Sequence, residues 1–192
     1  MRVTEDRYRR DRRAFDLAWR LVLLGARTGT IARWTGIAAR RVRAFRRSYG
    51  AESKHSGLVR PRGRSPQRIQ LLLRSPRHRQ DAVELACLLR AAGVLPISAF
   101  ESGRRPFPNI ERGEVLCNAF ESLKVNCCDS IVTIEQAFLL FAALATGDEI
   151  DFAQCTRCGH KAIIDRLQAL PQRCDRCSGA FKVDRGDINA ST

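Results

Sequence analysis

The chain has 192 residues, which is enough for one domain of ordinary size or for one domain with a small satellite. Apolar residues make up 44% and charged residues 28% of it, a composition that excludes a disordered or collagen-like chain. The formal net charge is +14, and this charge is unevenly distributed.

The positive charge is concentrated in the N-terminal part of the sequence. Residues 1–80 carry 22 Lys and Arg against 5 Asp and Glu, whereas residues 81–192 carry 12 against 15. Thirty of the 34 basic residues are Arg, whose guanidinium group matches phosphates and guanine edges bidentately. A GC-rich genome would explain Arg in place of Lys but not the asymmetry. We therefore expect the first 80 residues to face a polyanion.

We expect neither a membrane-spanning helix nor a signal peptide in this chain. Its longest apolar run, Ala137 to Ala145, has nine residues, whereas a membrane-spanning helix needs about 20. The first residues are charged where a signal peptide would be apolar. We therefore expect a cytoplasmic protein that makes no membrane contact, and cysteines that are metal ligands or buried thiols rather than disulfides.

Apolar periodicity and capping signals predict a chain that is almost all helix before residue 150. The first helix should run from about Glu5 to Leu24. Further helices are expected at 28–34, 38–49 (ended by Gly50), 67–74, from Ser75-Pro76 to Gly93, at 109–125, and at 134–146 after a Thr133/Gln136 capping box. Residues 50–66 are predicted to form a basic linker or arm, and residues 94–108 a loop.

Residues 28–49 fit a DNA-binding helix-turn-helix. Such a motif needs a small residue where its helices cross, which Ala32 supplies, and a glycine with positive φ in the turn, which Gly36 supplies four residues later. Apolar residues must also lock the second helix to the first. We assign this role to Ile31, Ile37, Val42 and Phe45.

The second helix of this motif has a basic outer face on a helical wheel with Val42 inward. A row of arginines suits base edges in the major groove and the flanking phosphates. We predict that Arg40 and Arg43, nearer the start of the helix, read bases and that Arg47 contacts phosphate. The complete set of predicted DNA contacts on this helix is Arg40, Arg41, Arg43 and Arg47. The alternative is an ordinary helical hairpin with a solvated arginine face.

The arm contains Arg-Pro-Arg-Gly-Arg-Ser-Pro at residues 60–66, which resembles the core of an AT-hook. Glycine permits close approach to a narrow minor groove, and proline keeps the chain extended. Arg62 and Arg64 are therefore candidate DNA contacts. The sequence leaves three interpretations open for them: base contact, phosphate contact or a plain linker.

Two Cys-x2-Cys pairs near the C-terminus are the most specific motif in the sequence. Cys155 and Cys158 are separated from Cys174 and Cys177 by 15 residues, a spacing typical of a four-thiolate zinc site. With no open coordination position, one Zn2+ per chain would be structural. The alternatives are redox-active pairs, disulfides, or replacement of one ligand by His160. We expect Cys87 and Cys117 to pack in the core and assign no function to Cys127 and Cys128.

The expected fold is thus mainly α, with a helical N-terminal domain that contains the helix-turn-helix and a small zinc-ribbon-like C-terminal domain. We place the helical domain, with its DNA-binding and partner-binding functions, at residues 1–150. The four-cysteine domain should occupy residues 151–185 and a tail residues 186–192.

The order of these features resembles the FlhC family of flagellar transcriptional activator subunits, over roughly residues 10–180. The matching segments are Leu24-Gly25-Ala26-Arg27, the helix-turn-helix, the arm, Leu116-Cys117-Asn118-Ala119-Phe120, the helix running into Gly147, and the four cysteines. The resemblance implies binding to double-stranded DNA in a hetero-oligomer with an FlhD-like subunit. It also implies recruitment of RNA polymerase to flagellar and motility promoters, and zinc ligation by the four matching cysteines.

Other functions remain as alternatives. A partner-independent DNA-binding regulator of other genes would have the same motifs, and a zinc-ribbon RNA-binding or adaptor protein would need only the cysteines. A nucleic-acid enzyme such as a recombinase would need a nucleophile or a carboxylate cluster. The sequence has no Walker loop, HExxH or G-x-S-x-G motif, so we expect no enzymatic activity.

Overall fold

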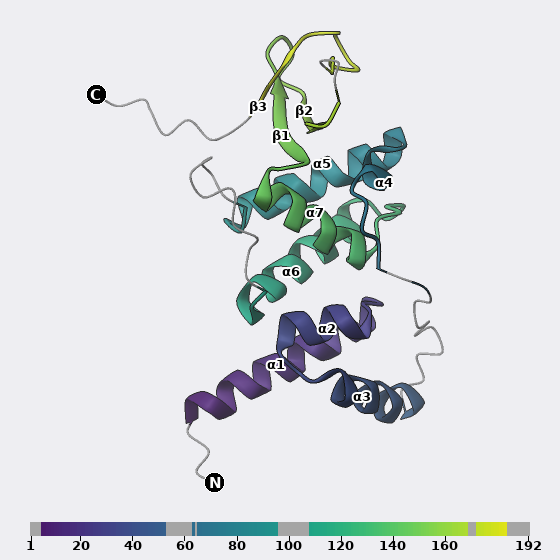
Figure 1. The fold of residues 1–192 in the computed structure, drawn as a ribbon, viewed down its shortest axis with the longest axis vertical. Helices are drawn as coiled ribbons and strands as arrows, with labels where there is room; N and C mark the ends of the chain where they lie inside the picture. Colours follow the sequence, from purple (N-terminus) through teal and green to yellow (C-terminus); the bar gives the residue numbers. More distant parts are fainter. Residues whose placement is uncertain (1–4, 53–62, 64, 96–107, 169–171, 184–192) are drawn as a thin grey trace, which may run out of the picture. The chain divides into compact units, whose positions relative to one another are not determined.

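The computed structural model describes residues 5–52, 63, 65–95, 108–168 and 172–183. Within these ranges the protein is mainly helical, as predicted, and its three strands follow the last helix (Figure 1). The helices are α1 (Glu5–Leu23), α2 (Thr28–Thr35), α3 (Ala39–Glu52), α4 (Gln70–Leu73), α5 (Pro76–Ala91), α6 (Ile110–Asn126) and α7 (Ile134–Thr146). The strands are β1 (Ile150–Cys155), β2 (Lys161–Asp165) and β3 (Phe181–Val183). No described helix combines the length and apolar character needed to cross a membrane.

The chain divides into two compact units. The first comprises residues 1–65, 107–118 and 133–135, and the second comprises residues 66–106, 119–132 and 136–192. The predicted domain division stays a prediction, and the predicted tail at 186–192 lies outside the described residues.

The first unit has a core formed by α1, α2, α3 and the beginning of α6. Leu17, Leu21 and Ile31 are fully buried, and Val42 of α3 is 1% exposed. Helix α6 approaches α1 closely at Gly113, where an added Cβ would lie 2.7 Å from a Leu17 methyl group. A larger residue at this position would force the Leu17 side chain to shift.

The second unit joins α4, α5 and most of α7 to a small sheet. The strand order is β2-β1-β3, and β1 pairs antiparallel with both neighbours. Ile150, Ala153 and Ile163 of this sheet are buried. Gly147 has a φ of 67° and ends α7, so the chain turns directly from the helix into β1.

The helix limits agree with the sequence in some places and differ in others. Helix α5 begins at the predicted Ser75 cap, whose Oγ accepts from the N–H of His78 at 3.3 Å, and α7 has its predicted limits. The predicted end of α3 at Gly50 is wrong, because the helix continues to Glu52. A glycine inside a helix costs only about 1 kcal/mol. Helix α4 is shorter than predicted, at four residues. Most of the predicted arm and of the predicted loop at 94–108 lies outside the described residues.

Candidate metal centre and nucleic-acid interface

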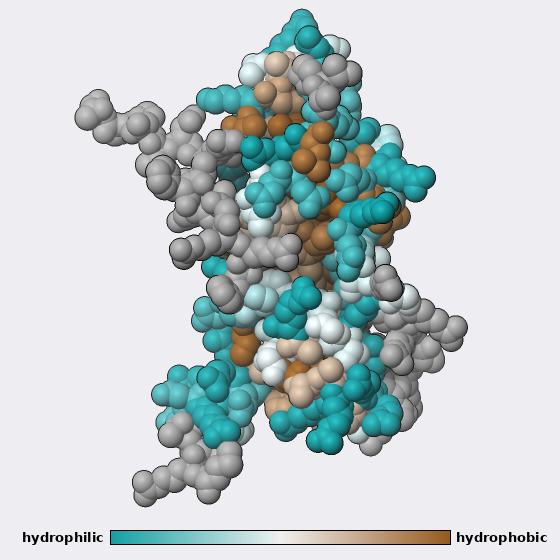
Figure 2. Space-filling view, in the orientation of Figure 1, coloured by the Kyte–Doolittle hydropathy of each residue, from teal (hydrophilic) through white to brown (hydrophobic). Residues whose placement is uncertain are grey.

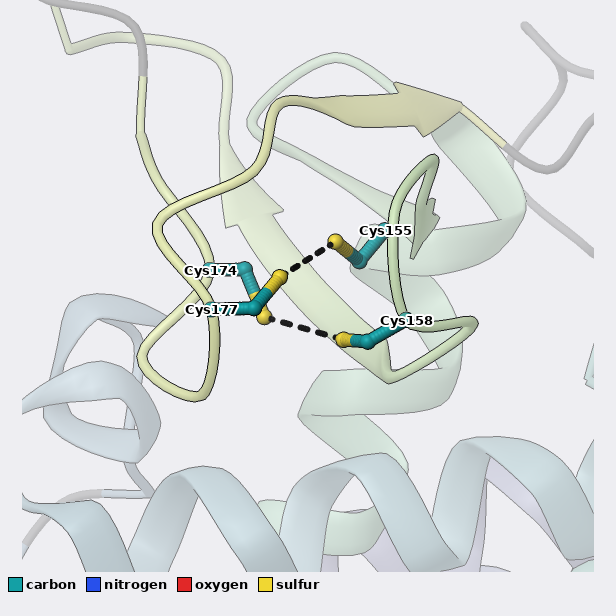
Figure 3. Close-up of side chains that lie close together, drawn as sticks. All are labelled: Cys155, Cys158, Cys174 and Cys177. Carbon is teal, nitrogen blue, oxygen red and sulfur yellow. Dashed lines mark hydrogen bonds between the residues drawn. The ribbon is translucent and has the colours of Figure 1, made fainter.

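The four cysteines of the two Cys-x2-Cys pairs lie together, as their spacing predicts (Figure 3). Their Sγ atoms all lie within 4.8 Å of one another, with 3.4 Å between Cys155 and Cys177 and 3.6 Å between Cys158 and Cys174. A tetrahedral ion with metal–sulfur bonds of about 2.3 Å separates its ligands by about 3.8 Å. The arrangement therefore fits a metal such as zinc. These separations are far longer than a disulfide bond of about 2.05 Å, and His160 is not part of the cluster.

The two cysteine pairs are built by the same pattern of backbone hydrogen bonds. In the first turn, the N–H of Gly159 donates to the carbonyl of Cys155 at 3.0 Å; in the second, the N–H of Ser178 donates to Cys174 at 2.8 Å. The N–H of each leading cysteine also donates to the carbonyl five residues later, on His160 and Gly179. We call residues 155–160 and 174–179 the first and second knuckles.

Both knuckles need a residue with left-handed backbone geometry directly after the second cysteine. Gly159 has a φ of 70° and Ser178 a φ of 58°, and Ser178 is the one non-glycine residue with positive φ in the described chain. Gly179 is constrained by space instead, since an added Cβ would lie 3.0 Å from the sulfur of Cys155 and 3.2 Å from that of Cys177. Small residues therefore let the second knuckle close around the sulfur cluster.

The electrostatics of the cluster favour a bound cation. Hydrogen bonds from the N–H groups of Cys158 and Arg157 lower the pKa of the Cys155 thiol to about 6. The N–H of Gly179 favours the Cys177 thiolate, but desolvation and hydrogen bonds to the neighbouring cysteines outweigh it and raise the Cys177 pKa to about 12. Four sulfur atoms this close ionise together only when a cation neutralises them.

An arginine occupies the third position of both knuckles. The Arg157 guanidinium donates to the carbonyl of Cys177 at 3.3 Å and so joins the two knuckles. Arg176 is the equivalent residue of the second knuckle and is exposed. A divalent cation with four thiolates would have a formal charge of −2, which these two nearby guanidinium groups would partly offset.

The other four cysteines lie apart from this cluster. Cys117 is fully buried, as predicted, whereas Cys87 is only half-buried. The thiol of Cys127 donates to a carboxylate oxygen of Glu84 at 3.2 Å, and this bond raises the pKa of Cys127. Cys128 is exposed. None of these contacts joins them to a metal site among the described residues.

Helices α2 and α3 flank a three-residue turn that begins at Gly36. Gly36 has a φ of 72°, and its N–H donates to the carbonyl of Ala32 at 3.0 Å. Ile31 and Val42 are buried on either side of the turn, whereas Ile37 is half-buried. The turn glycine is thus where the sequence predicts it. The assignment of these helices to the helix-turn-helix class of DNA-binding folds stays a prediction.

The inner face of α3 packs on α1 through aromatic rings. Phe45 makes an edge contact with Trp19, with ring centres 5.7 Å apart, and a tilted contact with Phe15 at 6.2 Å. The guanidinium of Arg41 lies over the Phe15 ring at 4.6 Å. Arg46 donates to the carbonyl of Ala26 at 2.6 Å. Two arginines of α3 therefore help to hold the helix in place.

The predicted base contacts Arg40 and Arg43 and the predicted phosphate contact Arg47 are all exposed on α3. Within the described chain they make no ion pair. Arg41, also predicted to contact DNA, is exposed but stacked on Phe15. The predicted contacts Arg62 and Arg64 lie outside the described residues.

Glu135 supports the start of α2, a structural role that the sequence did not reveal. Its carboxylate is 6% exposed and accepts from the N–H of Arg27 at 2.7 Å and from the hydroxyl of Thr30 at 2.9 Å. It thereby caps the N-terminus of α2, where Arg27 provides no side-chain cap. No local signal could reveal a partner more than 100 residues away.

Comparison with known proteins gives no match to any protein-family model, and no curated protein matches the chain significantly.

Proposed function

We propose that this protein is a DNA-binding subunit of a transcriptional activator, similar to FlhC. The observation that carries the proposal is the division of α3 into two faces. Val42 and Phe45 fix the inner face, while Arg40, Arg43 and Arg47 project from the helix without an acidic partner in the described chain. A rigid helix with a row of uncompensated guanidinium groups suits the major groove, where arginine binds guanine edges and phosphates.

The contrast with α1 strengthens this argument. Three arginines of α1 have acidic neighbours: Arg9 lies 3.3 Å from Glu5, Arg12 lies 3.9 Å from Asp16, and Arg13 lies 2.6 Å from Glu114. Helix α3 carries no acidic residue before its last position. The positive potential over the outer face of α3 is therefore not cancelled locally, and this supports association with a polyanion.

We further propose that the four cysteines hold one structural Zn2+ per chain in a zinc-ribbon-like unit. A set of four thiolates selects soft or borderline metals, and a closed tetrahedral shell leaves no position for a substrate. When bound, zinc would join the two knuckles and so supply folding energy to residues 150–183.

The partners follow from the resemblance. An FlhD-like subunit would complete the hetero-oligomer, and RNA polymerase would be recruited to flagellar and motility promoters. The non-enzymatic role and the cytoplasmic location belong to the same proposal.

The decisive experiment measures binding of the purified protein to fluorescent duplex DNA and to duplex RNA of the same sequence. A major-groove reader binds the DNA, with affinity that falls steeply with salt, because side chains cannot enter the deep, narrow major groove of A-form RNA. Arg74→Ala, which removes one exposed charge from the second unit, is the control. Equal binding to both duplexes, or to RNA alone, would favour the RNA-binding alternative.

A further inference from the structure

The first turns of α1 form an extension with no buried residue. Every residue from Glu5 to Arg13 is exposed, and Ala14 is the first buried residue of the helix. This end of α1 lies clear of α2 and α3 in Figure 1, and Figure 2 displays it as a hydrophilic projection. Isolated helices this short are marginal in water, so the extension depends on the packed part of α1. We call residues 5–13 the overhang.

The overhang begins beside the N-terminal end of α3. Contacts between α3 and α1 advance along both helices in the same direction, from Arg41 over Phe15 to Phe45 against Trp19. Farther along α3, Arg46 donates to the carbonyl of Ala26, which follows the end of α1. The start of α3 therefore lies level with Phe15, and the overhang continues past it. In a helix-turn-helix protein this end of the second helix meets the base edges.

One face of the overhang is aligned with the face of α1 that holds α3. Tyr8 precedes Phe15 by seven residues, and Arg12 precedes Trp19 by seven, so each pair differs by only about 20° around the helix. Tyr8 is 62% exposed and the Arg12 side chain 71%. The face of α1 that carries Phe15 and Trp19 thus continues beyond α3 with the exposed side chains of Tyr8 and Arg12.

The dimensions match a nucleic-acid backbone beside the major groove. Tyr8 lies about 10 Å and Arg12 about 4–5 Å beyond Phe15 along the helix axis, at 1.5 Å per residue. The major groove is about 12 Å wide and lined on both sides by phosphates. Tyrosine hydroxyl and arginine guanidinium groups are both common phosphate ligands. The ion pair of Arg12 with Asp16, at 3.9 Å and with both side chains exposed, contributes little to stability.

We propose that Tyr8 and Arg12 contact the phosphate backbone of a DNA duplex whose major groove holds α3. The proposal rests on the proposed DNA-binding function and assigns it a second contact, on α1. These contacts add affinity and fix orientation but carry no sequence information.

The test compares Arg12→Ala and Tyr8→Ala with Arg10→Ala as the matched control. Arg10 is an exposed arginine of the same overhang, but it points about 160° away from both residues. Binding to a preferred and a scrambled duplex is measured over a range of salt concentrations. We expect each of the two variants to weaken binding to both duplexes by roughly three- to tenfold. Arg12→Ala should also reduce the slope of log affinity against log salt concentration by about 1. Arg10→Ala should leave the affinity for both duplexes nearly unchanged.

Three results would overturn the proposal while leaving the proposed function intact. Binding unaffected by Arg12→Ala and Tyr8→Ala, but lost in Arg43→Ala, removes the overhang from the interface. Equal losses in Arg12→Ala and Arg10→Ala, with Tyr8→Ala unaffected, reduce the role of the overhang to a diffuse charge effect. A changed sedimentation coefficient in Tyr8→Ala, without loss of DNA binding, assigns this face to a protein partner or a second copy. Failure of the unmodified protein to bind any duplex would instead reject the proposed function itself.

Discussion

The two cysteine knuckles and helix α3 hold their functional groups by different means. Each knuckle positions its sulfur atoms through hydrogen bonds between residues no more than five positions apart. The outer face of α3 depends on contacts with Phe15, Trp19 and Ala26, which lie 20 or more residues away from Arg46 or Phe45. Local geometry defines the first site, whereas the packing of three helices defines the second. The two sites should therefore respond to different perturbations.

Removal of one sulfur ligand should have the largest effect of any single change. Cys174→Ser leaves three thiolates and loses much of a metal-binding free energy of about 10–16 kcal/mol. The same free energy stabilises the folded form of residues 150–183. We expect loss of bound metal, measured by inductively coupled plasma mass spectrometry, and rapid proteolysis after residue 150. Helices α1–α3 should persist, with little change in the helical circular dichroism signal.

Loss of both the helical circular dichroism signal and the fold of residues 150–183 in Cys174→Ser would contradict this prediction. So would a full-length wild-type protein that carries no metal after purification in zinc-containing medium.

A buried charge on the inner face of α3 should have the second-largest effect. Val42 is 1% exposed, so Val42→Asp places a carboxylate in the core of the first unit and lowers its free energy of unfolding by about 3 kcal/mol or more. Ala44→Asp is the matched control, because Ala44 is exposed two positions away. Thermal melts should separate the two variants by many degrees, while metal content stays unchanged in both. Equal melting temperatures would mean that Val42 does not lock α3 to the core.

A smaller effect should follow from backbone geometry in the knuckles. Ser178 adopts a φ of 58°, where a residue with a Cβ is strained by about 1 kcal/mol relative to glycine. Ser178→Gly should therefore raise metal affinity by roughly fivefold in chelator competition. Gly159→Ala, at a φ of 70°, should lower the affinity by a similar factor, because the added Cβ would make only an ordinary contact, 3.5 Å from the Gln154 side chain. Changes of the same sign in both variants would show that backbone strain does not control the site.

The sequence predicted those features that depend on neighbouring residues. The four-cysteine cluster, the turn at Gly36 and the beginning of α5 at Ser75 each follow from a short motif with one favourable geometry. The limits of α7 follow equally from its apolar run and from Gly147.

Features that depend on distant residues could not be predicted. The position of Arg41 over Phe15 and the bond from Arg46 to Ala26 need the packed arrangement of three helices. The buried Glu135 at the start of α2 comes from a segment 105 residues beyond Thr30. The continuation of α3 through Gly50 is a case in which the remainder of the helix outweighs a weak local breaker.

The most direct test of the account is DNA binding by a variant in which Arg40, Arg43 and Arg47 are all replaced by Ala. All three side chains are exposed, so the melting temperature should remain close to that of wild type. The account predicts that preference for a selected duplex over a scrambled one is lost, with about 1–3 kcal/mol of binding free energy for each base-contacting arginine. A triple variant that melts normally and binds the selected duplex as tightly as wild type would contradict the central claim that α3 reads DNA.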